Sequence, residues 1–323
     1  MSKLIPDFVF RRLFDALSLS ESKLNILIYH RVLAEPDPLR PWEIDAKNFE
    51  NHLSWLTNTF NVIPLRDGVQ AMRDGTLKNR SLCITFDDGY LDNLEVALPL
   101  LKKYKMPATF FCTSAFIDGG MMWNDQIIEA VRSWPSESIS VSELALDNLP
   151  LNTLEDRAKS AEKILNKLKY IEKTERANIA QTLFEESGAN PGQQMMSSKE
   201  ILHMHNQGME IGGHTHNHPI LSNLNSDNAR YEIEHNKKTL EAIINQKISS
   251  FAYPNGKPGK DFLVEHSQMV SDLGYETAVS TSPGVSDHDT NTLQLPRFTP
   301  WDKSRDKFLL RLALNHFQKT SFA

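Results

Sequence analysis

The sequence predicts an α/β protein whose parallel sheet, open or closed into a barrel, is covered by helices. Short segments rich in β-branched and aromatic residues alternate with stretches of helical periodicity, a pattern typical of such sheets. The 323 residues suffice for one large barrel with insertions. The expected strands are Asn25–Tyr29, Leu82–Phe86, Ala108–Thr113, Met209–Gly213, Ser249–Tyr253 and Glu276–Thr281.

Two helices between these strands have clear signals. Asn93–Tyr104, between the second and third strands, carries apolar residues at helical spacing. Ser197 and Glu200 form a capping box ahead of a helix over Ile201–Asn206, and Gly208 is placed to end that helix. The fourth expected strand follows at once, so the order of strands and helices supports a parallel sheet.

Residues 1–23 are expected to form an amphipathic segment ahead of a single domain over residues 24–323. The apolar stripe of this segment is more typical of packing on the protein's own domain. The alternative is peripheral membrane contact through residues 4–17, which include Arg11 and Arg12. The stripe comprises Leu4, Ile5, Phe8, Val9, Leu13, Ala16 and Leu17.

Residues from about 125 to 195 interrupt the strand pattern and are expected to form a helical insertion. They show helical periodicity and no convincing strand. Their Lys and Glu residues alternate densely, which predicts a solvated helix face rather than a specific binding surface.

Composition and charge exclude several classes of protein. Hydrophobic residues make up 40% and charged residues 24%, as in folded domains rather than disordered chains. A net charge of −6 gives no electrostatic basis for binding nucleic acid. The sequence has neither a long apolar run nor a signal-like N-terminus, so we expect a cytoplasmic protein. The alternative is a cytoplasmic protein that is peripheral to the membrane through residues 4–17. Cys83 and Cys112 lie on neighbouring expected strands and are expected to be buried thiols rather than a disulfide.

Two adjacent carboxylates, Asp87 and Asp88, follow the second expected strand directly and precede Gly89. Barrels and open α/β sheets place their active sites at the carboxyl ends of strands. Successive strand residues point to opposite sides, so one carboxylate can bind a cation while the other stays free beside it. Asp-Asp-Gly is also ordinary turn or helix-capping chemistry, and these residues alone leave that alternative open.

Three histidines, His214, His216 and His218, follow the fourth expected strand within five residues. Imidazole is a common ligand of zinc and similar ions, and two histidines with one carboxylate leave open positions for water and substrate. His214 and His218 can face one ion, whereas His216 is expected to point elsewhere. Asp88 is the carboxylate available to complete the site, and a polar surface loop is the alternative.

Both motifs match a known pattern in full, and four further segments extend the match. The segments are Thr85-Phe86-Asp87-Asp88-Gly89, His214-Thr215-His216-Asn217-His218-Pro219, Ile28-Tyr29-His30, Pro107-Ala108-Thr109-Phe110-Phe111, Phe251-Ala252-Tyr253-Pro254-Asn255-Gly256 and Leu295-Pro296-Arg297-Phe298. They resemble the polysaccharide deacetylase family, the NodB-homology domain of carbohydrate esterase family 4. The resemblance spans roughly residues 24–298 and implies a distorted (β/α) barrel with the helical insertion.

The resemblance also implies a metal-dependent hydrolase. Asp88, His214 and His218 would hold one divalent ion, zinc ahead of cobalt or nickel, and Asp87 would act as the catalytic base. The backbone N–H of Asn255 would stabilise the oxyanion. The expected reaction removes an N-acetyl group from an N-acetylhexosamine residue and releases acetate.

The family's third motif corresponds to the segment Phe251-Ala252-Tyr253-Pro254-Asn255-Gly256, which departs from the family pattern at two positions. Ala252 stands where the family has an arginine, and Asn255 stands where it has an aromatic residue. We predict that Arg297 replaces that arginine and orients Asp87, with an ordinary structural ion pair as the alternative.

Further residues are expected to contact the substrate. Tyr253 and Pro254 belong to the third motif, and Trp123 could stack on a sugar ring, with plain packing as its alternative. His30 ends the first strand at the same rim and is expected to bind substrate or donate a proton, unless it is only a satisfied strand-end histidine. The family's usual Leu-x-His has no close match, because the similar sequence at His316 lies in a helical tail.

The sequence therefore predicts a metal-dependent N-deacetylase that acts on an N-acetylated polysaccharide or lipid-linked glycan. A catalytically silent carbohydrate-binding protein is the alternative of another class. A different amide or ester hydrolase of the same fold is the alternative within enzymes. Asp87 favours the enzyme, because metal binding needs only Asp88 and two histidines.

Overall fold

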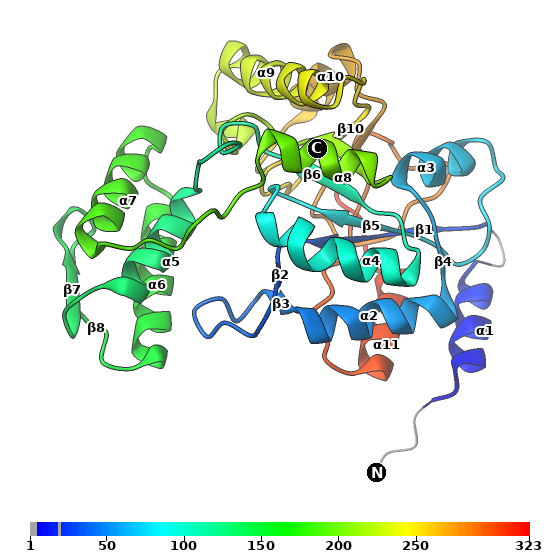
Figure 1. Cartoon of the computed structure of the whole chain (residues 1–323). Coiled ribbons are helices and arrows are strands. Elements are labelled where there is room, and N and C mark those ends of the chain that lie inside the picture. Colours follow the sequence, from blue (N-terminus) through cyan, green and yellow to red (C-terminus); the bar gives the residue numbers. More distant parts are fainter. Residues whose placement is uncertain (1–4, 19–20) are drawn as a thin grey trace.

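The computed structural model describes residues 5–18 and 21–323, and a curled parallel sheet lies at its centre (Figure 1). β1 and β5 pair from Leu24 opposite Ser81 to Tyr29 opposite Phe86, so both strands end at the same edge. In spatial order the strands are β1 (Leu24–Tyr29), β5 (Ser81–Phe86), β6 (Thr109–Cys112), β9 (Glu210–Gly213), β10 (Ser250–Ala252) and β11 (Thr277–Val279), with β4 (Asn61–Val62) also beside β5.

All six strands expected from the sequence are present, with ends shifted by one or two residues. β4 was not expected, because two residues are too few to show a periodic pattern. Cys83 on β5 and Cys112 on β6 are both buried and free, which confirms the prediction of buried thiols.

The sheet closes into a distorted barrel through the segment over residues 292–298. Leu295 pairs with Val279 of β11, and Phe298 pairs with Leu27 of β1, both in parallel. The segment therefore occupies the place of a closing strand, and this arrangement confirms the expected barrel. It also brings Arg297, between these two pairs, into the ring of strands.

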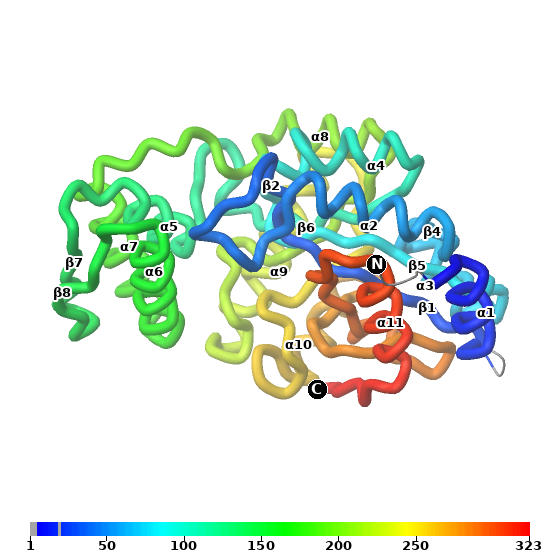
Figure 2. The backbone as a smooth tube through the Cα atoms, turned by 90° about the horizontal axis from the view of Figure 1, so that it is seen from below, coloured from blue at the N-terminus to red at the C-terminus, as the bar shows by residue number. Residues whose placement is uncertain are grey.

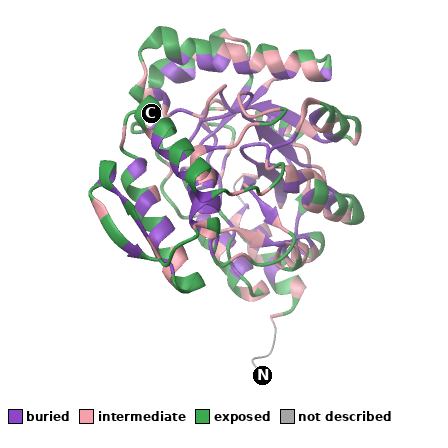
Figure 3. Cartoon of the chain, turned by 60° about the vertical axis from the view of Figure 1, so that its left-hand side comes forward, coloured by how far each residue is buried: buried purple, intermediate pink, exposed green. Residues whose placement is uncertain are grey.

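Alternating side chains of β5 divide between the outer face and the interior of the barrel. Leu82, Ile84 and Phe86 pack in the large cluster under the surrounding helices, whereas Cys83 belongs to the interior cluster. The period of two along a strand therefore directs Asp87 into the interior. Figure 3 shows the strands as the buried centre of the molecule, with exposed residues on the outer faces of the helices.

Helices cover the outer face of the sheet. The helix expected over residues 93–104 begins as a π-helical turn, Asn93–Ala97, and continues as α4 (Leu98–Tyr104). α8 (Ser198–Asn206) has the expected capping box, and Gly208 has a left-handed φ of 87° just after it. The other elements around the barrel are α1 (Asp7–Leu17), β2 (Val32–Leu33), β3 (Ile44–Asp45), α2 (Ala46–Thr59), α3 (Leu65–Arg73), the 3₁₀ turn Leu221–Asn223, α9 (Ser226–Ile244), α10 (Val264–Asp272) and α11 (Arg305–Asn315).

The insertion forms a lobe beside the barrel with a hydrophobic cluster of its own (Figures 1 and 2). The expected helical insertion contains three helices, but the expectation that it holds no strand is wrong, because β7 and β8 pair as an antiparallel hairpin. Ile139 and Val141 of β7 are buried and alternate with serines, a pattern too short to stand out between long helices. The lobe consists of α5 (Trp123–Ser133), β7 (Ser138–Val141), the 3₁₀ turn Ser142–Leu144, β8 (Leu146–Pro150), α6 (Leu154–Leu168) and α7 (Lys173–Ser187).

α1 packs on the barrel, but not through the whole stripe expected from the sequence. Phe10 and Phe14 are buried, and Leu13 and Leu17 pack beside them, which gives regular helical spacing. The expected Phe8, Val9 and Ala16 are exposed instead, because they lie on the opposite face. Leu4 of the predicted stripe lies outside the described residues. Within the described chain, no helix combines the length and apolar character needed to cross a bilayer.

Candidate active site

The loop after β5 turns sharply at Asp88. The N–H of Asp87 still donates to the Tyr29 carbonyl at 2.9 Å, which extends the pairing with β1. Asp88 has a left-handed φ of 81°, a strained conformation that clusters at functional sites. Its carbonyl accepts hydrogen bonds from the N–H and the Oγ1 of Thr113, at 3.2 and 2.9 Å. Gly89 completes the turn with a φ of 91°.

The histidine loop after β9 is held by hydrogen bonds on both sides of His214. A Cβ at Gly213 would lie 2.2 Å from the Tyr275 hydroxyl, so only glycine fits before the loop. The N–H of His214 donates to Asn236 Oδ1 at 3.1 Å, and its Nδ1 lies 2.7 Å from the Ala252 carbonyl. Because a carbonyl can only accept, Nδ1 carries the proton, and Nε2 is left with a free lone pair.

Asp88, His214 and His218 converge on one point. The Nε2 atoms of both histidines lie 3.4 Å from Asp88 Oδ1, and the three ligand atoms are within 4.8 Å of one another. His218 reaches this position through a left-handed φ of 55°. Asp88 Oδ1 is buried and has no hydrogen-bond partner among the described residues. A buried, unpartnered carboxylate oxygen that faces two imidazole nitrogens fits a divalent cation.

The charges of this cluster also suit a cation. Burial raises the pKa of Asp88, but His214 and His218 outweigh it, so the pKa is lowered and the carboxylate is ionised at neutral pH. Burial lowers the pKa of His218 to about 4 despite the nearby Asp88, which leaves this histidine neutral and able to act as a ligand. The pKa of His214 is raised, because Asp87 and Asp88 outweigh its burial. A bound cation would satisfy the same preference for positive charge.

Arg297 holds Asp87 from inside the barrel. Its Nη1 and Nη2 donate to Oδ1 and Oδ2 of Asp87, each at 2.7 Å. Its Nε donates to the Ser280 carbonyl at 2.8 Å, and Nη1 also donates to Thr85 Oγ1 at 3.2 Å. The predicted contact between Arg297 and Asp87 is therefore present, and its bidentate geometry fixes the plane of the carboxylate.

This ion pair determines the charge of Asp87. The side chains of Arg297 and Asp87 are only 0% and 3% exposed, so solvent screens their attraction weakly. Burial raises the pKa of Asp87, but Arg297 and then His214 outweigh it, and the pKa is lowered overall. Asp87 is therefore ionised at neutral pH.

A cavity of about 200 Å³ opens beside this cluster. Trp123 is half-buried in its wall and also packs against the core of the insertion. Asn255 is exposed with a left-handed φ of 58°, and its N–H has no acceptor within residues 5–18 and 21–323. The cavity is lined by Asp88, Met122, Trp123, Asn124, Lys169, Arg176, His218, Ile220 and Asn255.

Lys169 and Arg176 line this cavity but were not among the site residues expected from the sequence. Both belong to the insertion, whose dense Lys and Glu pattern predicted only a solvated face. No motif or spacing distinguishes them from the other cations of the insertion, so the sequence holds no signal for them.

The family model for polysaccharide deacetylases matches residues 74–185 and 169–278, which together make up more than half of the chain. The chain belongs to the polysaccharide deacetylase family. The matched region contains the insertion and the metal-type cluster, by which we mean Asp88, His214 and His218. β1 and Arg297 lie outside it.

Curated relatives of this deacetylase-family chain match it over part of their length. YxkH of Bacillus subtilis, whose name assigns it to the polysaccharide deacetylases, is 32% identical over 44% of this chain and 49% of its own length. The poly-β-1,6-N-acetyl-D-glucosamine N-deacetylase of Staphylococcus aureus is 27% identical over 31% of this chain and 39% of its own length. The chain therefore spans half or less of the length of these relatives.

Two solved structures share the fold over nearly the whole chain. Streptococcus pyogenes deacetylase PplD in complex with acetate superposes with a TM-score of 0.61 at 18% identity, and the match covers 90% of this chain and 98% of PplD. IcaB from Ammonifex degensii superposes with a TM-score of 0.59 at 17% identity, and the match covers 90% of this chain and 97% of IcaB. These matches support the barrel fold.

His30 lies at the rim, as expected from the sequence. It is half-buried, and its carbonyl accepts a hydrogen bond from Asn93 Nδ2 at 2.9 Å. Its charge is among the influences that lower the pKa of Asp87 and of Asp88, though after burial and the closer partners. The imidazole is therefore electrostatically coupled to both carboxylates.

Two predicted substrate contacts are wrong. Tyr253 is fully buried, stacks on Phe262 with ring centroids 3.7 Å apart, and donates through its hydroxyl to the Leu293 carbonyl at 3.0 Å. Pro254 is buried and does not line the cavity. Tyr253 and Pro254 of the third motif are therefore buried, and only Asn255 of this motif lines the cavity.

Two other histidines lie away from the cluster. His216 points elsewhere as expected, with Nδ1 2.9 Å from Ser114 Oγ and its ring 4.4 Å from that of His235. His316 packs against Phe14 of α1 and takes no part in the site.

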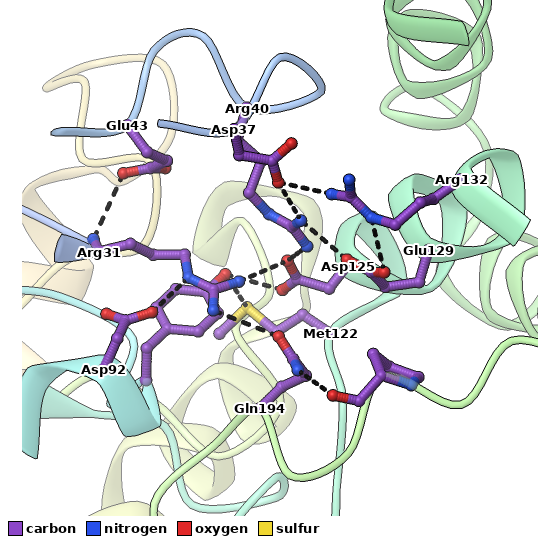
Figure 4. A network of polar contacts seen from close by, with 12 residues as sticks. Arg31, Asp37, Arg40, Glu43, Asp92, Met122, Asp125, Glu129, Arg132 and Gln194 are labelled. Atoms are coloured by element: carbon purple, nitrogen blue, oxygen red, sulfur yellow. Dashed lines mark hydrogen bonds and ion pairs between the residues drawn. The ribbon is translucent and has the colours of Figure 1, made fainter. Parts of the chain in front are cut away.

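A buried polar network fixes the insertion next to the first motif (Figure 4). Arg31 donates to Asp92 at 2.7 Å and to Asp125 of α5 at 3.3 Å. Arg40 donates to the same Asp125 at 2.9 Å. Tyr90, directly after Gly89, also donates its hydroxyl to Asp125 at 2.9 Å. The start of α5, and with it Trp123, is thereby tied to the turn that carries Asp88.

Proposed function

We propose that this chain is a metal-dependent hydrolase that removes N-acetyl groups from N-acetylhexosamine residues of a polysaccharide or lipid-linked glycan and releases acetate. Membership of the family supports the reaction class. The S. aureus relative, named for poly-β-1,6-N-acetyl-D-glucosamine, supports an N-acetylhexosamine polymer as substrate.

The ionised Asp87, held by Arg297 beside the three-residue cluster, is the observation that carries the proposal. A cation needs Asp88, His214 and His218 but not Asp87. A separate buried carboxylate with a lowered pKa therefore favours an enzyme over a silent carbohydrate-binding protein.

Asp88, His214 and His218 are the proposed ligands of one divalent ion, with zinc ahead of cobalt or nickel. When bound, such an ion polarises a carbonyl group and makes water a stronger nucleophile at neutral pH. Asp87 accepts the proton of the attacking water, because Arg297 keeps its carboxylate ionised and in a fixed plane.

The other residues of the cavity act on the acetyl group and the sugar. The free N–H of Asn255 donates to the acetyl oxygen, where negative charge develops. His30 is the proposed donor of a proton to the departing amine, because it shares the rim with Asp87. Trp123 offers its ring to the sugar.

Contact with a membrane through residues 4–17 is a separate proposal, supported by Phe8 and Val9, which are 58% and 40% exposed next to Arg11 and Arg12. Sedimentation with anionic vesicles tests it, and Phe8→Ser should weaken the binding. A cytoplasmic location stays a prediction.

Acetate release tests the main proposal. The full chain is depleted of metal with a chelator, and zinc, cobalt or nickel is restored before incubation with a panel of N-acetylated oligosaccharides, including β-1,6-linked N-acetylglucosamine. We expect release only after metal is restored. Oligosaccharide binding without acetate release under every metal would instead identify a carbohydrate-binding protein.

A further inference from the structure

The wall that the insertion contributes to the cavity is cationic. Lys169 follows the end of α6, and Arg176 lies in the first turns of α7. Both line the same cavity as Asp88, His218 and Asn255. The cavity lining contains no acidic side chain apart from Asp88, which belongs to the metal-type cluster.

Lys169 and Arg176 have no ion-pair partner within the described part of the chain, as is also true of Arg157, Lys163 and Lys167 of the insertion, whereas its other cations are paired. Lys159 pairs with Glu155 at 2.6 Å, and Lys173 pairs with Glu232 at 3.3 Å. Arg132 pairs with Glu129 at 3.0 Å. Among these unpaired cations, Lys169 and Arg176 are the two that line the cavity.

Arg176 is also oriented for a ligand. It is half-buried, with its guanidinium 4.9 Å from the centroid of the Trp123 ring. Burial lowers the pKa of Arg176, and Glu172 offsets only part of that effect. A guanidinium that stacks on an aromatic face keeps N–H donors at its edge, where they match the two oxygens of a carboxylate or phosphate.

Acidic residues near the cavity are already engaged. A groove of about 840 Å³ shares Lys169 and Arg176 with the cavity and continues between α7 and α9. In its lining, Glu232 accepts hydrogen bonds from Asn217 at 2.7 and 2.9 Å, and Glu172 caps α7. The remaining acid, Asp261, accepts the N–H of Lys257 at 3.0 Å.

We propose that Lys169 and Arg176 form a subsite for an anionic group, a carboxylate or a phosphate ester, carried by the glycan next to the N-acetylhexosamine residue that is deacetylated. The inference rests on the proposed function, and it narrows the substrate class from any N-acetylated glycan to an acidic one. Neutral and acidic glycans would share the metal-type cluster and Trp123, but only acidic ones would engage both cations.

The test compares three oligosaccharides of equal length on the full chain loaded with zinc. One is neutral, one carries a uronic acid beside the N-acetylhexosamine residue, and one carries a phosphate ester there. At low ionic strength we expect kcat/KM to favour one or both acidic substrates by about tenfold, and the preference to shrink as salt is added. Equal kcat/KM for all three would overturn the subsite, and the two acidic arms identify its anion.

Calorimetric binding of the same oligosaccharides to the Asp87→Asn variant gives the preference without turnover. If the wild-type chain releases acetate from none of the three oligosaccharides but the variant binds the acidic ones more tightly, the proposed reaction fails and the subsite stands. If all three bind equally, the subsite fails whatever the reaction.

Matched variants assign the preference to the two side chains. Lys169→Gln and Arg176→Gln should each lower the acidic-to-neutral ratio by about three- to tenfold. Lys163→Gln, on the exposed side of α6, should leave the ratio as it is. Arg176→Gln also removes the contact with Trp123. This loss should lower kcat/KM for acidic and neutral substrates alike, so it cancels in the ratio. If Arg176→Gln lowers both substrates equally and Lys169→Gln leaves the ratio unchanged, Arg176 only supports Trp123, and the proposal is wrong.

Discussion

The two walls of the cavity come from different parts of the chain and are built differently. The barrel wall consists of short loops directly after buried strands, where Asp88, His218 and Asn255 all have left-handed backbone conformations. The insertion wall consists of Trp123, Asn124, Lys169 and Arg176, which are half-buried or exposed and make few polar contacts. Strain and dense hydrogen bonding on one wall contrast with open, charged side chains on the other.

This contrast assigns different work to the two walls. Reaction geometry tolerates little displacement, and the hydrogen-bonded barrel wall supplies fixed atoms. One reaction can serve different substrates, and substitutions in an insertion can alter the contacts with substrate without disturbing the strands. We therefore expect barrel variants to change metal content and kcat, and insertion variants to change KM.

The largest effect is expected from the metal-type ligands. His214→Ala removes one of three ligands and Asp88→Asn removes the one charged ligand, so bound metal should fall well below one ion per chain and acetate release should fall to background. Elemental analysis of the purified protein and an acetate assay measure the two quantities.

His216→Ala is the matched control, because it removes a histidine of the same loop that contacts Ser114 instead of Asp88. It should retain the metal. Equal metal content in wild type, His214→Ala and Asp88→Asn would remove the proposed site.

The next effect is expected at Asp87. Asp87→Asn keeps the shape of the side chain but removes the base, so kcat should fall by about 10² to 10⁴ while metal content stays near that of wild type. Metal analysis and steady-state kinetics on one preparation separate the two.

Asp87→Asn also leaves Arg297 buried without a negative partner, which can destabilise the fold by about 3–5 kcal/mol. The double variant Asp87→Asn with Arg297→Met removes both charges and provides a folded comparison. Loss of metal from Asp87→Asn as severe as that from Asp88→Asn would mean that the roles assigned to the two carboxylates are wrong.

A smaller effect is expected at Arg297. Arg297→Met removes the charge that outweighs burial, so the pKa of Asp87 should rise and the acidic limb of the pH–rate profile should move to higher pH. At neutral pH kcat should fall on the order of 10- to 100-fold, with metal retained. An unchanged rate and pH profile would reduce Arg297 to a structural role.

Stability should respond to pH with a defined sign. In wild type the lowered pKa of Asp87 means that its ionised form stabilises the fold, fully above about pH 4 and less as pH falls through the lowered value. In Arg297→Met the pKa is raised, so the sign reverses and this group destabilises the fold as pH rises. Thermal unfolding at several pH values measures the difference.

Much of the barrel wall could be predicted from the sequence, because its residues are contiguous. Asp87 and Asp88 follow one strand and His214 and His218 follow another, and the ends of parallel strands meet at one rim. The contact of Arg297 with Asp87 could also be predicted, since the family resemblance implies an arginine that Ala252 does not supply, and Arg297 lies in another matching segment.

Predictions failed where tertiary packing decides which way a side chain faces. Tyr253 follows a strand of only three residues, too short to show which face its ring takes, and the ring lies on Phe262 in the core. Lys169 and Arg176 reach the cavity because the network around Asp125 fixes the position of the insertion. That network joins residues far apart in the sequence, so no local pattern reveals it.

The smallest effect, and the sharpest test of the difference between the walls, is expected at Trp123. Trp123→Ala removes a ring from the insertion wall without touching the metal-type cluster, so KM should rise by about tenfold while kcat and metal content change little. Because the ring also packs on the core of the insertion, Trp123→Phe keeps part of that packing and should retain more of the affinity. Steady-state kinetics on both variants measure kcat and KM separately. A fall in kcat with KM unchanged would mean that the insertion helps to build the reacting geometry, and the division of work between the two walls would then be wrong.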